Sequence, residues 1–262
     1  MASISIVTVN IEHGKKSPIK IKEKSDIITN NNPDIIFIQE SNKNSINLDN
    51  YNYINYSPNK GYIDIFLRKN SDWKQYYITS FNTKYSYTMR TCKIIFVKNI
   101  NTKKIIKLAN IHLCGGRFDE NDKIGGMLLG NIKDIHERKN EILKELINIY
   151  DIDIVAGDFN SDLICYIQDE LLQHHLEYFK KISPKTSINI FKEWNIAPYK
   201  YLESNNYTLA LDKSKIKYTS MFKTHPDSIW FKNGKQLDYK YVKLIKHNLS
   251  DHNGIYSKII IN

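Results

Sequence analysis

The stretch IVAGDFNSD (residues 154–162) decides the fold, because an apolar run ends here on a glycine and is followed at once by polar side chains. The run is short and contains β-branched residues, which predicts a buried strand. Asp158 and Asn160 stand two residues apart at its end. Residues two apart on a strand point to the same face. The spacing therefore predicts that both side chains face one spot at the mouth of a sheet.

Other apolar runs also end on a polar residue. SISIVTVN ends at Asn10, DIIFIQE ends at Glu40, and IIKLANIHL carries His112 near its end. Further strands are predicted for three segments: YIDIFLRK, CKIIFVKN and SDHNGIYSKIII. Polar groups at strand ends are where a rigid sheet can hold catalytic side chains.

Two or three helices are expected between the strands. Ser17 and Pro18 suit the N-cap and the first position of a helix that runs to about residue 30. Apolar residues recur at helical spacing over 131–150, and residues 163–182 also favour a helix. The segment 227–245 predicts a hairpin that turns at Asn233 and Gly234. We expect one α+β domain over residues 1–262, since no linker or repeat interrupts the chain.

The composition narrows the class of protein. The 38 Lys and Arg residues outnumber the 28 Asp and Glu residues, giving a net charge of +10 that favours a polyanionic partner such as nucleic acid. The abundance of Lys, Asn and Ile is also what an A/T-rich genome would impose, so the charge alone does not establish that partner. The sequence has neither a signal peptide nor an apolar run long enough to span a membrane, and its three cysteines make no disulfide framework. An intracellular protein without a transmembrane segment is expected, and no obligate protein partner is evident.

The motifs, taken in order, resemble those of the endonuclease/exonuclease/phosphatase superfamily, which includes DNase I, exonuclease III and the abasic-site endonucleases. The matching segments are TVNIE (8–12), IQE (38–40), NIHL (110–113), GDFN (157–160) and SDHNGI (250–255). The resemblance covers nearly the whole chain. It implies a two-layered, DNase I-like β-sandwich flanked by helices, with a divalent metal at one end.

The same resemblance implies a role for each matched residue. Glu40 would hold the metal, with Asn10 and Asp251 beside it. Asp158 would orient or deprotonate the attacking water. Asn160 would fix the geometry. His112 would donate to a non-bridging phosphate oxygen, and His252 would contact the phosphate or act as an acid or base. Oxygen ligands of this kind suit Mg²⁺ or Mn²⁺ rather than zinc.

The partner of His252 is where the chain departs from the family pattern. The family places an Asp at the start of a strand to bond the second ring nitrogen, and this chain offers two choices. Asp227 follows Pro226, whereas Asp238 is followed by Tyr239, which is locally closer to the family motif. We favour Asp227, because the expected hairpin leaves a family-like spacing before Asp251, and Asp238 stays open as the rival.

The sequence predicts the site residues more closely than it predicts the substrate. A Mg²⁺-dependent phosphodiesterase acting on DNA is expected, either an abasic-site or general endo/exonuclease or a tyrosyl-DNA phosphodiesterase. The alternatives are an RNA nuclease or deadenylase, a phosphoinositide-type phosphatase, and an inactive nucleic-acid-binding adaptor. Arg117, in the Gly-rich stretch after His112, is expected to clamp a phosphate, although a plain surface loop explains that stretch equally well. Tyr62 is expected to contact bases by stacking, with Tyr85, Tyr87 and Trp194 as further possibilities.

Overall fold

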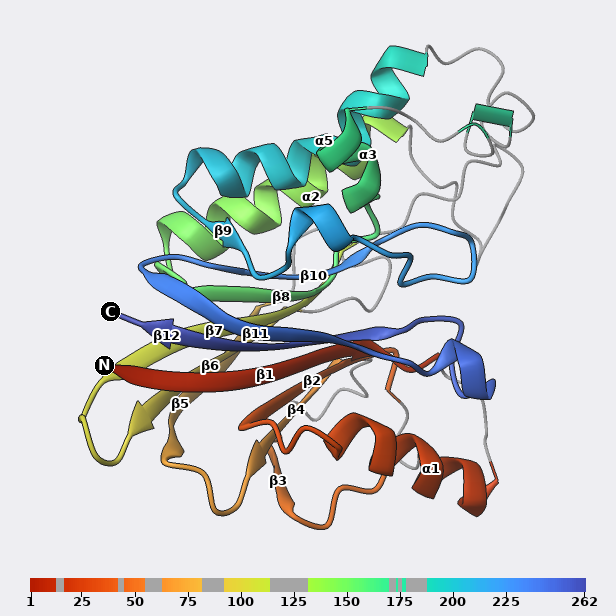
Figure 1. Ribbon diagram of the computed structural model, residues 1–262. Helices are drawn as coiled ribbons and strands as arrows, with labels where there is room; N and C mark the ends of the chain where they lie inside the picture. Colours follow the sequence, from red (N-terminus) through yellow and green to blue (C-terminus); the bar gives the residue numbers. More distant parts are fainter. Residues whose placement is uncertain are drawn as a thin grey trace.

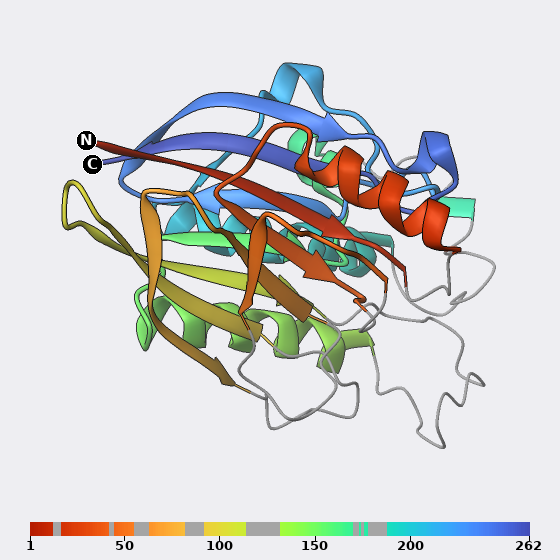
Figure 2. The same ribbon diagram turned by 90° about the horizontal axis from the view of Figure 1, so that it is seen from below.

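Two six-stranded sheets pack face to face in the computed structural model, and helices cover both outer faces (Figure 1). The structure describes residues 1–12, 17–41, 45–54, 63–81, 92–113, 132–169, 173, 176–177 and 188–262. This arrangement confirms the expected α+β sandwich. The two termini lie side by side, since the first and last strands pair with Ala2 opposite Ile261 (Figure 2).

Sheet A contains the first and last strands of the chain. Its order is β11-β12-β1-β2-β4-β3. The strand bounds are β1 Ala2–Asn10, β2 Ile35–Gln39, β3 Tyr51–Ile54, β4 Ile63–Arg68, β11 Gly234–Val242 and β12 Gly254–Ile261. Within this sheet β1 and β2 run parallel, and the other neighbours run antiparallel.

Sheet B is built the same way from the middle of the chain. Its order is β5-β6-β7-β8-β10-β9. The strand bounds are β5 Trp73–Phe81, β6 Cys92–Asn99, β7 Ile105–His112, β8 Ile154–Asp158, β9 Thr208–Leu209 and β10 Asp227–Phe231. Here β7 and β8 form the parallel pair. Each sheet therefore has one central pair of parallel strands, whose carboxyl ends meet at the same edge of that sheet.

The helices pack on opposite sides of the sandwich. Helix α1 (Pro18–Thr29) covers sheet A, while α2 (Ile132–Asn148), α3 (Leu163–Gln168) and α5 (Ile188–Ser204) lie over sheet B (Figure 1). Helix α1 begins as the sequence predicts, with Pro18 at its start and the Ser17 side chain accepting a hydrogen bond from the Lys20 amide. No helix in the described ranges is long and apolar enough to cross a bilayer.

Three apolar layers hold the elements together. Residues such as Ile6, Phe37 and Ile154 fill the space between the sheets. Leu143 and Leu146 of α2 pack with Tyr199 of α5 against the outer face of sheet B. A smaller cluster joins α1 to sheet A. Because both sheets are buried on both faces at their centres, the central strands have continuous apolar stretches rather than strict alternation.

Three sequence predictions differ from the structure. The helix expected over 163–182 is interrupted, because α3 ends at Gln168 and Asp169 takes a left-handed conformation. Helix α5 was not predicted, since Pro198 lies inside it and proline normally argues against a helix interior. The expected hairpin is also wrong: β10 pairs with β8 and β9 in sheet B, whereas β11 pairs with β12 in sheet A. The turn at Asn233 therefore carries the chain from one sheet to the other.

Candidate active site

The polar strand ends of both sheets meet at one end of the sandwich. Asn10 ends β1, His112 ends β7 and Asp158 ends β8, while Glu40 directly follows β2. These four strands are the two parallel pairs, so their carboxyl ends point the same way within each sheet. Asp227 opens β10, the antiparallel neighbour of β8, in register with Asp158. The sheet topology thus brings together residues that are far apart in sequence.

Asp158 lies at the centre of this group and is almost fully buried. Its Oδ2 accepts a hydrogen bond of 3.0 Å from Asn10 Nδ2. Its Oδ1 accepts one of 2.7 Å from the backbone amide of Asn160. The carboxylate is therefore held at both oxygens, one from each sheet.

The surroundings of Asp158 keep it charged. Burial by itself would raise the pKa of this carboxyl, but His112, His252 and the bonds from Asn10 and Asn160 outweigh it, so that the pKa is lowered. A carboxyl group with a lowered pKa stays ionised at neutral pH, so both of its oxygens can accept hydrogen bonds. Asp158 is thus suited to orienting a water molecule.

Asn160 lies beside Asp158, although not in the way that strand alternation predicts. Strand β8 ends at Asp158, and Asn160 takes a left-handed conformation with φ of 46°. Its side-chain amide donates to the Leu113 carbonyl at 2.8 Å, next to His112. The turn after β8 is therefore tied to the end of β7.

His252 forms the second contact of the group. Its Nδ1 lies 2.8 Å from Asp227 Oδ2, and both residues are buried. The Ser250 hydroxyl accepts the backbone amide of His252 and donates to the Asn10 carbonyl, so the loop that carries His252 is bound to β1. Asp238 lies elsewhere, half-exposed on β11 beside Lys240. The structure thus places Asp227, the favoured choice, against the histidine.

The Asp227–His252 pair behaves as a buried ion pair. Burial opposes the charge on His252, but Asp227, Asp158 and Asp251 together raise the histidine pKa to about 10. Burial raises the pKa of Asp227 to about 6, with His252 acting in the opposite direction. Each partner favours the ionised form of the other, and with 2.8 Å between Nδ1 and Oδ2 the contact has the geometry of a buried ion pair. His252 is thus an imidazolium that faces the centre of the site.

His112 bridges the two carboxylates that come from different sheets. Its Nε2 lies 3.5 Å from Asp158 Oδ2 and 3.7 Å from Glu40 Oε1. The histidine is buried, whereas the Glu40 side chain is 23% exposed. Glu40 also takes a left-handed conformation, with φ of 51°. Such backbone strain in a non-glycine residue costs about 1 kcal/mol or more and is concentrated at functional sites.

Gly157 is required by the closeness of the two strands that carry His112 and Asp158. A Cβ atom at this position would lie 1.9 Å from the Ile111 carbonyl oxygen, and φ is 150°. No side chain fits there without moving the backbone. The glycine of the GDFN motif therefore lets β8 approach β7.

The donor set fits a hard divalent cation. Glu40, Asp158 and Asp251 supply carboxylate oxygens, and the first two approach the same His112 nitrogen. Within the described residues, Asp158, Asp227 and His252 form the tightest group of acidic and histidine side chains, with ligand atoms within 4.8 Å of one another. Two of these three already bind each other, and a charged His252 would repel a cation. Glu40, which is partly exposed and does not belong to the Asp227–His252 pair, remains available as an oxygen ligand.

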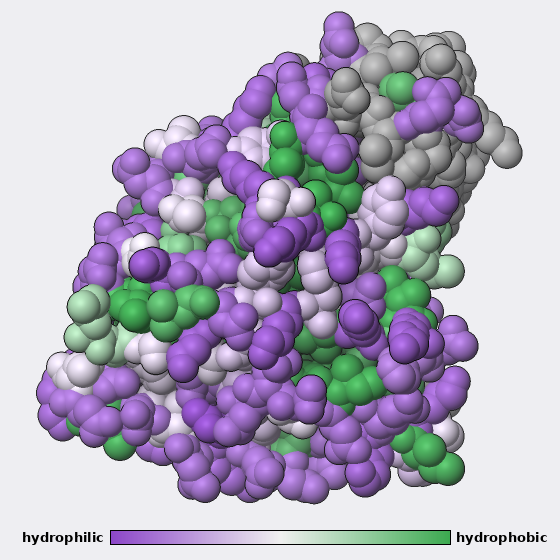
Figure 3. Space-filling view, viewed as in Figure 1, coloured by the Kyte–Doolittle hydropathy of each residue, from purple (hydrophilic) through white to green (hydrophobic). Residues whose placement is uncertain are grey.

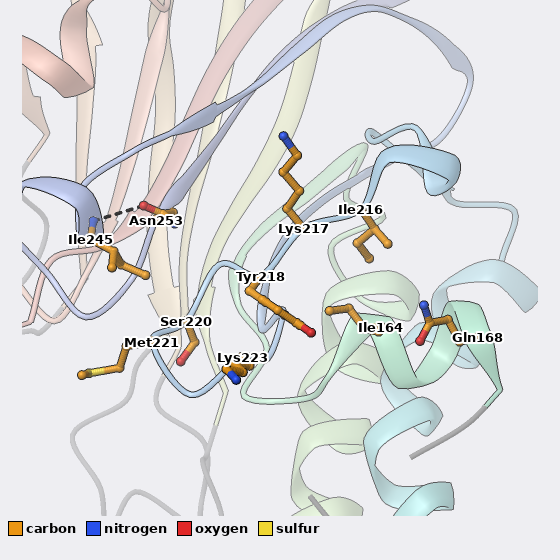
Figure 4. Close-up of a pocket in the computed structure, with 10 residues that line it drawn as sticks. All are labelled: Ile164, Gln168, Ile216, Lys217, Tyr218, Ser220, Met221, Lys223, Ile245 and Asn253. Carbon is orange, nitrogen blue, oxygen red and sulfur yellow. Dashed lines mark hydrogen bonds between the residues drawn. The ribbon is translucent and has the colours of Figure 1, made fainter. Parts of the chain in front are cut away.

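A pocket of about 630 Å³ opens next to the His252 loop (Figure 4). Ser220, in its lining, forms a backbone bridge with His252, and the amide of Met221 donates to the Asp251 carbonyl. Two exposed lysines, Lys217 and Lys223, and the exposed ring of Tyr218 border it. The rest of the lining is largely apolar, from Ile164, Ile216, Met221 and Ile245. The pocket therefore combines an apolar wall with two lysines and one aromatic ring, and its backbone is hydrogen-bonded to the site.

Two predicted substrate contacts, Arg117 and Tyr62, lie outside the described residues, as do Tyr85 and Tyr87. Trp194, expected in a loop or at a sheet edge, belongs to α5.

Sequence reasoning did not single out Ser250 as a separate residue, nor Thr219, whose Oγ1 accepts the Asp227 amide. It also missed the buried lysines Lys24 and Lys139. A signal for the lysines exists, because Lys139 stands four residues after Ile135 and four before Leu143, on the apolar stripe of α2.

Comparison with known proteins supports the fold. No family model and no curated protein sequence matches the chain. Solved structures do match: an endonuclease/exonuclease/phosphatase from Bacteroides vulgatus has a TM-score of 0.66 and 15% identity, with 100% of each chain covered. D. rerio TDP2 complexed with single strand DNA product has a TM-score of 0.64 and 14% identity, covering 99% of each chain. The human Nocturnin catalytic domain with bound sulfate gives 0.59 and 16%, covering 99% of this chain and 95% of that one.

The protein thus has the fold of the endonuclease/exonuclease/phosphatase superfamily, as the motifs predicted. The matched motif residues lie together at one end of that fold.

Proposed function

We propose that the protein is a metal-dependent phosphodiesterase that hydrolyses phosphodiester bonds in nucleic acid, with DNA as the preferred substrate. The observation that carries this proposal is the arrangement around Asp158. A buried, ionised carboxylate lies between two histidines, and a partly exposed glutamate stands beside it. Phosphodiester hydrolysis needs these parts: a group to orient water, cationic donors for the phosphate, and oxygen ligands for a metal.

Asp158 orients the attacking water in this proposal. Both of its oxygens already accept one hydrogen bond each, from Asn10 and from the Asn160 amide, which fixes the plane of the carboxylate. Its remaining lone pairs can accept a bond from water. Asn160 keeps this geometry by anchoring the turn to the Leu113 carbonyl.

His252 supplies positive charge to the phosphate. Asp227 bonds its Nδ1, so Nε2 is the ring nitrogen left to meet a substrate oxygen. The raised pKa keeps this nitrogen protonated at neutral pH, ready to donate to an oxygen on which negative charge develops. His112 approaches the same region from sheet B and donates to a second phosphate oxygen.

Glu40 and Asp251 would hold the cation, Mg²⁺ or Mn²⁺, with Asn10 supporting them from β1. When bound, the cation supplies Lewis-acid stabilisation of the phosphate charge. The Asn10 side chain orients Asp158 toward that position, since its Nδ2 donates to Asp158 while its Oδ1 accepts the Glu12 amide.

A nucleic acid is the substrate that the surface favours. The chain carries a net charge of +10, and Lys217 and Lys223 border the pocket beside His252 (Figure 4). Tyr218 at the same pocket is 44% exposed and can stack on a base. The face shown in Figure 3 is mainly hydrophilic, with its apolar residues in separate groups, while Met221 in the pocket lining and the neighbouring Phe222 are exposed. Among proteins that share the fold, TDP2 has been crystallised with a single strand DNA product.

The experiment is a cleavage assay with Mg²⁺ or with EDTA. Labelled duplexes that are intact, carry an abasic site or bear a 5′-tyrosyl end are compared, with an RNA oligonucleotide and a phosphoinositide alongside. The proposal expects metal-dependent cutting of DNA in preference to RNA. Cutting of the RNA or the phosphoinositide alone would contradict the substrate, and the absence of any metal-dependent hydrolysis would contradict the activity.

A further inference from the structure

Helix α2 contains a lysine that does not reach solvent. Lys139 is only 2% exposed, whereas Lys144 on the same helix is exposed. The Lys139 ammonium donates to the Asn160 carbonyl at 2.6 Å and to the Ser161 hydroxyl at 3.0 Å. Burying an ammonium group is costly unless its hydrogen bonds are made. The Lys139 ammonium group therefore binds the turn that follows Asp158 and stabilises it.

The turn after Asp158 donates a hydrogen bond to one oxygen of its carboxylate, Oδ1. The amide of Asn160 donates to Asp158 Oδ1, and the carbonyl of the same residue accepts from Lys139. Asn160 is left-handed, a conformation that asparagine adopts readily in turns, and these two bonds fix the position of its peptide group. The Tyr199 hydroxyl adds a further bond, of 2.5 Å, to the Ser161 carbonyl. Lys139 thus fixes the peptide that orients the carboxylate.

A second buried lysine, Lys24, lies beside the residue that bonds the other carboxylate oxygen, Asp158 Oδ2. Lys24 of α1 is fully buried, and its ammonium donates to the Ile11 carbonyl at 3.1 Å. Ile11 directly follows Asn10, whose side chain donates to Asp158 Oδ2. The two lysines come from helices on opposite outer faces of the sandwich. Each one contacts the backbone of, or next to, an asparagine that bonds Asp158.

We infer that Lys139 and Lys24 are positioning residues, which fix the two asparagine contacts that hold the Asp158 carboxylate in its reactive orientation. The inference rests on the proposed function, in which Asp158 orients the attacking water. Both lysines are buried and donate to the backbone beside the site, Lys139 also to the Ser161 hydroxyl, so in this inference they act on the geometry of Asp158 and not on the substrate. Removal of either ammonium should therefore disturb geometry rather than substrate affinity.

The test replaces each lysine by methionine, which keeps the length and apolar stem but removes the donor. Lys144→Met on α2 and Lys20→Met on α1, both at exposed positions, are the matched controls. Misplacing a reacting group by about 1 Å costs up to roughly 100-fold in rate. We expect kcat on the preferred nucleic acid to fall about 10- to 100-fold in Lys139→Met and Lys24→Met, with KM changed less than about twofold. The controls should match the wild type.

Amide hydrogen exchange provides a readout that does not depend on activity. In the wild type the Asn160 amide is protected by its bond to Asp158, and Lys139→Met should speed its exchange by more than the change in global stability accounts for. If Lys139→Met does not fold at 25 °C, Lys24→Met takes its place, measured by kcat and KM. Wild-type exchange at Asn160 together with wild-type kcat would overturn the inference. An inactive wild-type protein would instead contradict the proposed function, while the exchange result would still decide the role of Lys139.

Discussion

The two sheets contribute differently to the candidate active site. Sheet B supplies His112, Asp158 and Asp227, which are all buried and lie within a hydrogen-bonded or charged contact of another site residue. On the sheet A side, Asn10 and His252 are also buried, but Glu40 and Asp251 are only half-buried. A buried, bonded group is pre-organised, whereas a partly exposed carboxylate keeps access to ions from solvent. In the proposed function the buried half of the site orients the reaction, and the open half, Glu40 with Asp251, takes the metal.

Among the residues that surround Asp158, Asp227 should give the largest effect, because its substitution breaks the buried half of the site. Asp227→Asn removes the charge that holds His252 as an imidazolium, and kcat should fall about 10³-fold. The rival, Asp238→Asn, is the matched control and should retain near wild-type activity, because Asp238 lies on β11 beside Lys240. Steady-state kinetics on the preferred substrate measure both. If the two variants exchange these behaviours, the assignment of the histidine partner is wrong.

A change in the open half should affect the metal requirement more than the chemistry. Glu40→Gln removes a carboxylate ligand, so the Mg²⁺ concentration for half-maximal activity should rise about 10- to 100-fold, with partial recovery at high metal. The matched control is Glu141→Gln, at an exposed position of α2. A metal titration of activity decides the matter. If the metal requirement is unchanged and kcat falls, Glu40 orients the reaction and is not a metal ligand.

The pH dependence of the free energy of unfolding tests whether His252 is charged in the folded protein. The pKa of His252 rises from its usual 6.5 to about 10 in the folded protein. The folded state therefore binds this proton more tightly than the unfolded state does. The stabilisation is fully present below pH 6.5 and is lost as the pH rises through about 10. Wild type should lose on the order of 2 kcal/mol more unfolding free energy than His252→Gln over this range.

Urea unfolding at several pH values gives these free energies. Ionisation of residues far from the site affects both proteins equally. Asp227 loses its cationic partner in His252→Gln, so the difference reports on the Asp227–His252 pair as a unit. A difference that stays constant from pH 6.5 to 10 would show that the buried ion pair is not formed.

The smallest effect is expected at the pocket beside the site. Replacing both Lys217 and Lys223 by Gln should weaken DNA binding moderately and reduce the slope of log K against log salt by about 1 to 2. Lys103→Gln with Lys235→Gln is the control, since both lysines are exposed at the opposite end of the strands. Fluorescence anisotropy at several salt concentrations measures the slope. Equal slopes in the two double variants would exclude the pocket as a phosphate contact.

Local sequence patterns predicted the central strands and their polar ends well. Strand β8 is an apolar run that stops at Asp158, and the largely apolar strands β1 and β7 end at Asn10 and His112, so the strand end and the site position coincide. The placement of Asp227 against His252 was favoured for a wrong reason. The expected hairpin does not exist, because pairing between distant strands overrides the local turn signal at Asn233 and Gly234.

Local sequence patterns did not predict that Lys24 and Lys139 are buried. A helical lysine usually faces water, and only the tertiary structure reveals that Lys24 and Lys139 point inward to strand-end carbonyls. Their positions on apolar stripes carry the signal, yet the same position is also compatible with a long side chain that bends out to solvent. Helix α5 was missed for a related reason, since Pro198 is tolerated where tertiary packing stabilises the helix.

The central claim is that the strand-end group around Asp158 hydrolyses nucleic acid with a metal. The most direct measurement compares wild type with Asp158→Asn on one labelled DNA substrate, with Mg²⁺ and with EDTA, and measures binding of the same DNA by both proteins. The account predicts cleavage only by wild type with metal, a loss of at least about 10³-fold in the variant, and similar DNA affinity. Equal cleavage by both proteins, or an equal loss of affinity and turnover in the variant, would contradict it.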